Sequence, residues 1–182
     1  FVLFGFITCN ASLFQAYGID QQSSAFYASL NGLIGIPTCI ISGIVIGKSG
    51  KPFIVAILGA AICAVICFFM PHLGDSSVAY IIYALATGIV PGGMIMTSMF
   101  IFTPQLAKRP ALIGLSMGLL NTLYYIGVFA STPVITALAG DNSSPANWTA
   151  PSLLMVALCV IVLICSVVGM GMAKKQKAEA AA

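Results

Sequence analysis

Charged side chains are scarce in this sequence. Only 6% of its 182 residues are Asp, Glu, Lys or Arg, and 60% are hydrophobic; soluble domains carry about 25% charged residues. A soluble fold of this length cannot bury so much apolar surface, because surface area falls too slowly with chain size. The composition therefore excludes nucleic-acid-binding proteins, acidic tails and disordered chains. An integral membrane protein remains.

Side chains suited to catalysis or metal binding are scarce as well. The single histidine, His72, falls in a predicted loop, and no Ser/His or Cys/His pair occurs within a predicted span. Cys63 and Cys67 stand one helical turn apart, with no His or acid to complete a metal site. We expect neither an enzyme nor a cofactor nor a bound metal. All six cysteines lie in apolar runs and are interpreted as small buried hydrophobic residues: Cys9, Cys39, Cys63, Cys67, Cys159 and Cys165.

Long uncharged runs are abundant, by contrast. Each interval between the sparse charges is long enough for one helix of about 20 residues, the length that crosses a bilayer, and too short for two. The alternation of membrane strands is absent, so the spans are predicted to be helices. We therefore predict an all-α membrane protein, a six-helix transmembrane bundle over 1–182 with a cytoplasmic tail over 174–182. The expected helices are roughly 1–17, 26–47, 53–70, 78–103, 112–139 and 152–173.

The few charges predict an orientation. With six crossings, all seven basic residues fall on one side of the membrane, and three of the four acidic residues fall on the other. Short loops rich in Lys and Arg mark the cytoplasm, so both chain ends are predicted to be cytoplasmic, in a multi-pass protein of the cell inner or plasma membrane. The basic residues are Lys48, Lys51, Lys108, Arg109, Lys174, Lys175 and Lys177, and the acidic residues opposite are Asp20, Asp75 and Asp141.

Polar residues mark four of the six predicted helices. The helices over 53–70 and 152–173 carry almost none and are expected to form an outer, lipid-facing pair. Polar side chains in lipid turn toward protein or a watery cavity, so the other four helices are expected to surround a cavity. The alternative stays open that their polar stripes only join helices, through hydrogen bonds worth about 0.6–2 kcal/mol each. The predicted lining and substrate-binding residues are Asn10, Phe14, Asn31, Thr38, Met94, Asn121, Tyr124 and Tyr125.

Glycine and proline interrupt two of these helices. Pro91, within the run Gly88 to Gly93, is expected to bend the helix over 78–103 with functional consequence, as interrupted helices do beside binding sites in membrane transport proteins. Two glycine pairs with GxxxG spacing, Gly88/Gly92 and Gly114/Gly118, predict close contact between helices.

The linker after the second predicted helix carries a recognisable motif. It reads Gly43-Ile44-Val45-Ile46-Gly47-Lys48-Ser49-Gly50-Lys51-Pro52, which resembles the signature loop of major facilitator superfamily transporters, Gly-x-x-x-Asp-Arg-x-Gly-Arg-Arg/Lys. Gly43, Lys48, Gly50 and Lys51 match, while Gly47 stands where the motif has Asp. The segment 104–111 leading into 114–116 is similar to the linker between helices 10 and 11 of that family.

The resemblance implies the carboxy-terminal six-helix half of a secondary transporter, which moves a small organic solute by alternating access. The implied gating residues are Gly43, Gly47, Lys48, Gly50 and Lys51, and with Gly47 in place of Asp this half cannot supply the acidic partner of the latch. The implied partners are a small-molecule substrate, a missing amino-terminal half and the lipid bilayer, without nucleic acid.

Two further expectations concern the chain as a whole. Because no charge falls within a predicted span, any proton-carrying group is expected in the missing half. Phe1 is not an initiator Met, which favours a fragment of a longer protein. The alternative reading is a non-transporting six-helix scaffold or assembly subunit.

Overall fold

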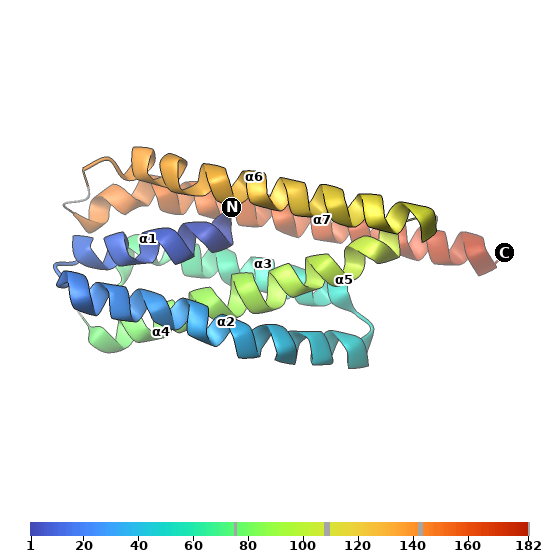
Figure 1. Ribbon diagram of the computed structural model, residues 1–182, viewed down its shortest axis with the longest axis horizontal. Helices are drawn as coiled ribbons and strands as arrows, with labels where there is room; N and C mark the ends of the chain where they lie inside the picture. Colours follow the sequence, from blue (N-terminus) through green and yellow to red (C-terminus); the bar gives the residue numbers. More distant parts are fainter. Residues whose placement is uncertain (75, 108–109, 142–143, 182) are drawn as a thin grey trace.

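The computed structural model describes residues 1–74, 76–107, 110–141 and 144–181. All regular structure in these ranges is helical, which confirms the predicted all-α class (Figure 1). The elements are α1 Val2–Ala16, α2 Gln21–Ser49, α3 Pro52–Phe68, η1 Met70–His72, α4 Ser77–Thr87, η2 Gly88–Met96, α5 Thr97–Leu106, η3 Pro110–Leu112, α6 Ile113–Ala139, η4 Pro145–Trp148 and α7 Thr149–Ala181.

The helices run side by side along the long axis of the molecule (Figure 1). Helices α4, η2 and α5 follow one another without a break and form one long rod, Ser77–Leu106. Figure 1 shows α6 and α7 along one side of the molecule, α2 and α4 along the other, and α1, α3 and α5 between them. The chain thus forms an elongated helical bundle.

Within the described residues, four helices are long and apolar enough to cross a membrane: Gln21–Ser49, Ser77–Leu106, Ile113–Ala139 and Pro145–Lys175. Helices α1 and α3 are apolar but shorter, with 15 and 17 residues. These lengths support a multi-pass membrane protein. The prediction of six crossings stays a prediction, because it needs α1 and α3 to cross as well.

Local sequence explains where α2 begins and ends. The Asp20 side chain accepts a hydrogen bond from the backbone N–H of Ser23, at 3.0 Å, so the helix begins at Gln21, earlier than the expected residue 26. Gly50 ends it with φ of +63°, a left-handed conformation that glycine adopts without strain. Pro52 then opens α3, where its missing N–H removes no helical hydrogen bond.

The buried core lies between α1, α3, α4 and α7. Phe14 of α1 meets three tyrosine rings edge to face, those of Tyr27, Tyr80 and Tyr83, at centroid distances of 5.6 to 6.3 Å. Helix α6 contributes little for its length, since only Ser131, Ile135 and Ala139 of its 27 residues are buried. Most of α6 is therefore open within the described chain.

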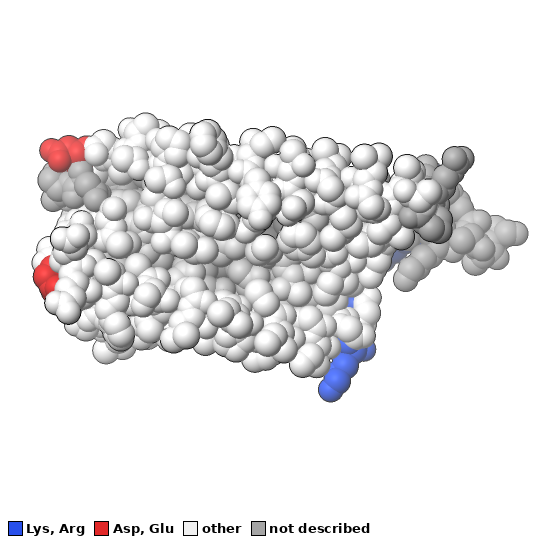
Figure 2. All heavy atoms as spheres, in the orientation of Figure 1, with Lys and Arg blue, Asp and Glu red and all other residues white. Residues whose placement is uncertain are grey.

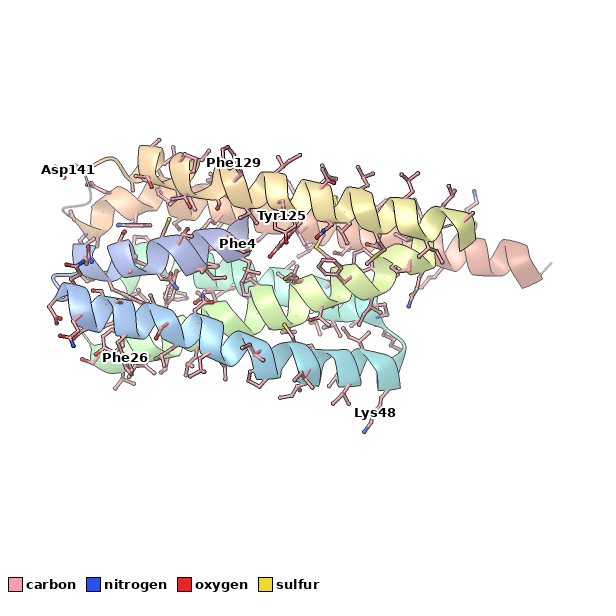
Figure 3. The ribbon with its side chains drawn as sticks, in the orientation of Figure 1. Phe4, Phe26, Lys48, Tyr125, Phe129 and Asp141 are labelled. Carbon is pink, nitrogen blue, oxygen red and sulfur yellow. The ribbon has the colours of Figure 1, made fainter. Side chains whose placement is uncertain are left out.

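Charged side chains gather at the two ends of the molecule. Figure 3 places Asp141 at one end and Lys48 at the other, and Figure 2 shows an uncharged face between the acidic and basic ends. Asp20 and Lys51 occupy the same two ends, at the start of α2 and the start of α3. The described charges thus segregate as the sequence predicts. Asp75, Lys108 and Arg109 lie outside the described residues.

Candidate functional site

A buried hydrogen-bonded junction joins α1, α2 and α4. Thr87 Oγ1 accepts from Asn10 Nδ2 at 3.2 Å and from Asn31 Nδ2 at 2.9 Å, and its hydroxyl donates to the Ala84 carbonyl at 2.9 Å. A threonine hydroxyl has two acceptor positions and one donor, so Thr87 is saturated. Asn10 and Thr87 are fully buried, and Asn31 is 2% exposed. The junction therefore holds three helices together.

Two buried polar atoms near this junction have no hydrogen-bond partner in the described chain. They are Asn10 Oδ1 and the Tyr83 hydroxyl. The Tyr83 ring contacts Phe6 and Phe14, one turn of α1 on either side of Asn10. An unpaired buried polar group costs about 1–3 kcal/mol, so these atoms mark the one part of the described core with spare hydrogen-bonding capacity.

Glycines bring α2 against the α4–η2 rod. A Cβ on Gly88 would lie 2.4 Å from the Asn31 carbonyl oxygen, and one on Gly93 would lie 2.3 Å from Thr38 Cγ2. Only glycine permits this approach, so the close contact predicted at Gly88 is present. Gly114 and Gly118 meet nothing within 4 Å, so the contact predicted for that pair is not made within the described chain.

The interruption predicted around Pro91 is a π-helical segment, η2. Proline has no N–H to donate, and the wider π turn absorbs the resulting gap in the hydrogen-bond ladder. The Cys39 thiol of α2 donates to the Gly92 carbonyl at 3.5 Å. Such segments often occur at functional sites, and this one lies directly against α2.

An exposed polar and aromatic face runs along α6. Asn121 is exposed, and Tyr125 is 60% exposed. The Tyr124 ring meets Phe4 edge to face at 5.7 Å and Tyr125 at 5.4 Å. Figure 3 labels Phe4 on α1 and Tyr125 on α6, two helices that pack against one another. We call Asn121, Tyr124 and Tyr125 the α6 face.

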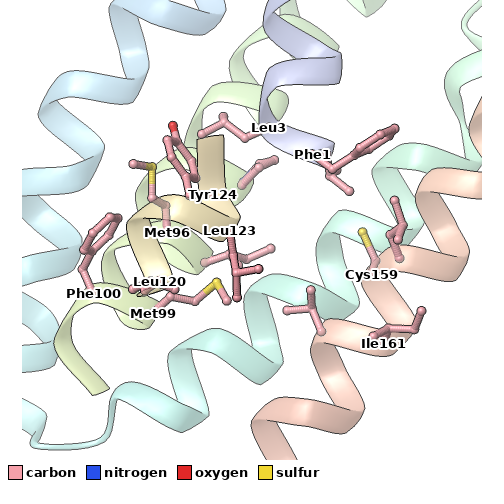
Figure 4. A pocket seen from close by; sticks show the side chains of 15 residues that line it. Phe1, Leu3, Met96, Met99, Phe100, Leu120, Leu123, Tyr124, Cys159 and Ile161 are labelled. Carbon is pink, nitrogen blue, oxygen red and sulfur yellow. The ribbon is translucent and has the colours of Figure 1, made fainter. Parts of the chain in front are cut away.

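An apolar cavity of about 350 Å³ adjoins the α6 face, at the start of α1 (Figure 4). Its walls come from α1, η2, α5, α6 and α7, and Tyr124 supplies the only side-chain hydroxyl among the described lining residues. Ligand pockets in proteins are typically about 300–1,000 Å³ and mostly apolar, with few polar groups. The cavity is therefore large enough for a small organic molecule. Typical lining residues are Leu3, Met96, Met99, Phe100, Leu123 and Tyr124.

The structure divides the predicted site residues into separate groups. Asn10, Phe14 and Asn31 are buried in or beside the junction, whereas Asn121, Tyr124 and Tyr125 form the α6 face. Of the eight, only Tyr124 lines the cavity.

The other two predicted site residues pack against helices. Thr38 donates to the Ile34 carbonyl of its own helix at 2.6 Å. Met94 Cβ lies 3.1 Å from the position of a Cβ on Gly59 of α3. Met94 thus faces α3, which was expected to be an outer helix. The eight residues that were predicted to line one cavity therefore do not surround a common cavity in this structure.

Sequence reasoning missed the residue at the centre of the junction. Thr87 belongs to a polar stripe of its helix, with Ser98 further along, but nothing in that stripe shows that two asparagines converge on it. It also missed the apolar cavity, because its lining residues look like ordinary membrane-facing side chains. Of the cavity-lining residues, only Tyr124 was among the binding residues predicted from the sequence.

The linker motif forms a compact turn between α2 and α3. Gly50 supplies the left-handed residue, and its N–H donates to the Ile46 carbonyl at 2.8 Å. Gly43 and Gly47 have nothing within 4 Å of an added Cβ, and Lys48 is exposed. The side of α2 that carries these two glycines is therefore open to another surface.

Comparison with known proteins gives one match. The sequence model of a family described as Major Facilitator Superfamily matches residues 1–132, more than half of the chain. The matched region includes the linker motif, the junction, η2 and the α6 face. Searches of curated proteins and of solved structures found no match.

Proposed function

The chain belongs to the Major Facilitator Superfamily, and from this we propose that it forms the carboxy-terminal half of a secondary transporter that moves a small organic solute by alternating access. Members of the family are transporters, so this multi-pass membrane protein is a transporter of that superfamily and the scaffold alternative is not favoured. What we propose beyond family membership is the substrate class, a small organic solute, and the mode of transport, alternating access.

We place the substrate path along the α6 face and the adjoining cavity. The path offers amide and phenol groups from Asn121, Tyr124 and Tyr125 beside apolar walls. It carries no charged side chain of its own, which suits an uncharged organic solute with a few hydrogen-bonding groups. The observation that carries the proposal is this polar face left open on a long apolar helix.

The second half of the transporter would cover the open sides of α2 and α6. Gly43 and Gly47 leave the end of α2 free for close approach, and Lys48 and Lys51 stand at that end. Because basic loops mark the cytoplasm, this end and the C-terminus beyond α7 are proposed to be cytoplasmic, whereas Phe1 lies midway along the bundle, against Gly127 of α6 (Figure 1). The Asp missing at position 47 would have to be replaced by an acidic group from the other half.

Alternating access requires helices that change their packing. We propose that η2 is the moving segment, because its π turns are held against α2 by glycine contacts and by the Cys39–Gly92 hydrogen bond, not by large interlocking side chains. The spare capacity of Asn10 Oδ1 and Tyr83 would be used by water or substrate when the junction loosens.

Cysteine accessibility tests the path without knowledge of the substrate. The full-length protein in native membranes, with exposed Cys165 replaced by Ala, would carry Asn121→Cys or Tyr125→Cys. We expect both to react with a membrane-impermeant methanethiosulfonate reagent. The matched controls are Leu58→Cys and Ile62→Cys on α3, which are also exposed in the described chain but are predicted to face lipid. Equal labelling of α3 and α6 positions contradicts the proposed path.

A further inference from the structure

Three buried cysteines converge between α3 and α7. Cys63 and Cys67 lie on successive turns of α3, and Cys159 comes from α7. Their Sγ atoms all lie within 4.8 Å of one another, and those of Cys67 and Cys159 are 4.0 Å apart. The sequence shows only the first pair, which by itself cannot complete a site. The packing of α7 supplies the third sulfur.

A hydrogen bond sets the register that brings the sulfurs together. The Ser152 hydroxyl of α7 donates to the Cys67 carbonyl at 2.7 Å, and both groups are buried. Ser152 stands two helical turns before Cys159 on the same helix. At the other end of the pair, Gly169 lets Phe53 approach α7, with 2.9 Å between Phe53 Cε1 and an added Cβ. The two helices are therefore fixed against sliding.

The sulfur triangle has the size of a three-coordinate metal site. Metal–thiolate bonds of about 2.3 Å place the three sulfurs of a planar complex about 4.0 Å apart. The distance between Cys67 Sγ and Cys159 Sγ equals this value, and the remaining separations stay below 4.8 Å. A small rotation of the side chains is enough to close the triangle.

The donor set selects the metal. Thiolates favour soft ions such as Cu(I), whereas structural zinc takes four ligands. In the part of the chain that the structure describes, no fourth Cys, His, Asp or Glu joins the group. We propose that Cys63, Cys67 and Cys159 bind one Cu(I) ion in a three-coordinate sulfur site.

Charge balance sets the protonation of the site. Each Cu–S bond to a thiolate displaces one thiol proton, which leaves to the solvent. Loss of one proton leaves the site neutral, and each further loss adds one negative charge. Cysteine binds a metal as the thiolate, so three-sulfur coordination releases three protons to the solvent and leaves the site with two negative charges. The apolar surroundings oppose this charge, so we expect Cu(I) binding to strengthen as the pH rises.

The apolar cavity gives access to this site. Cys159 is one of its lining residues, on the wall formed by α7 (Figure 4). The α6 face contributes none of the three sulfurs. Cys159 lies on the wall of the cavity that belongs to the proposed substrate path, but the metal site shares no residue with the α6 face, so these two can be tested separately.

Competition for Cu(I) tests the inference. The reduced full-length protein, purified in detergent, would be titrated against the chromophoric Cu(I) chelator bicinchoninate. We expect one Cu(I) per chain. Cys63→Ala, Cys67→Ala and Cys159→Ala should each weaken binding at least tenfold, the lower end of the loss seen when even an outer partner of a metal ligand is removed. The matched controls Cys39→Ala and Cys165→Ala should bind as the parent does.

X-ray absorption on the unmodified protein provides a second measurement. The expected first shell is three sulfurs at about 2.3 Å, and this readout does not depend on whether an alanine variant folds. Absence of Cu(I) binding, binding that the three cluster variants leave unchanged, or a shell with fewer than three sulfurs would each overturn the inference. Size-exclusion profiles identify variants that fail to fold.

Discussion

The α1–α2–α4 junction and the α6 face contain asparagines that look alike in the sequence and differ in the structure. Asn31 and Asn121 both stand in uncharged helical runs, among small and polar residues. Asn31 is 2% exposed and donates to Thr87, whereas Asn121 is exposed. A polar side chain in an apolar helix therefore has two uses. Where a neighbouring helix provides a hydrogen-bond partner, the side chain joins the two helices. Where no neighbouring helix does, the side chain remains available to a ligand.

The strongest test of this contrast is Thr87→Val, which removes the acceptor that both junction asparagines share. Each buried amide left unpaired costs about 1–3 kcal/mol, so we expect the largest loss of stability here. The measurement is the thermal unfolding midpoint of the purified full-length protein. Thr87→Ser keeps the hydroxyl and should retain most of the stability. If Thr87→Val unfolds at the parent temperature, the junction does not hold the helices together.

A second test enlarges Gly88. In Gly88→Ala, the new Cβ would meet the Asn31 carbonyl oxygen at 2.4 Å, so α2 and η2 must separate. Overpacking of this kind costs about 1–3 kcal/mol, measured again as a fall in unfolding temperature. Gly32→Ala on α2 is the matched control, since nothing lies within 4 Å of its Cβ, and it should leave the temperature unchanged or slightly raised. An equal effect of both variants would contradict the close contact.

The α6 face should show the opposite behaviour. We expect Asn121→Ala to lower transport by about fivefold, the factor that corresponds to one hydrogen bond of about 1 kcal/mol. Its stability should stay within about 0.5 kcal/mol of the parent, as for most exposed positions. Initial uptake rates in vesicles are compared with Leu115→Ala, an exposed apolar position on the same helix. Parent-level transport by both Asn121→Ala and Tyr125→Ala would remove the α6 face from the substrate path.

The smallest effect is expected at Asp20, which is fully exposed at the start of α2. The hydrogen bond from the Ser23 backbone N–H lowers the pKa of the Asp20 carboxyl from its usual value of 3.8. Its stabilising effect is therefore present above that value and is lost as the pH falls through the lowered pKa.

Asp20→Asn keeps a side-chain oxygen for the cap and removes the titration. We expect the unfolding temperatures of parent and variant to differ slightly at pH 7 and to converge as the pH falls below about 4. If the difference in unfolding temperature stays constant across this pH range, the charge of Asp20 does not contribute to stability. The result bounds what the charge of one exposed helix cap contributes to stability, for comparison with the larger effect of Thr87.

Composition and spacing alone determined the helical class, the opposite ends for acidic and basic residues, and the turn at Gly50. These properties depend on local rules: apolar runs form helices because lipid leaves their backbone groups no other partners, and a left-handed residue favours glycine. Tertiary structure decided which asparagine is buried, that Thr87 joins two of them, and that Cys159 meets Cys63 and Cys67. These contacts depend on the rotation and register of helices far apart in the chain, which no local pattern records.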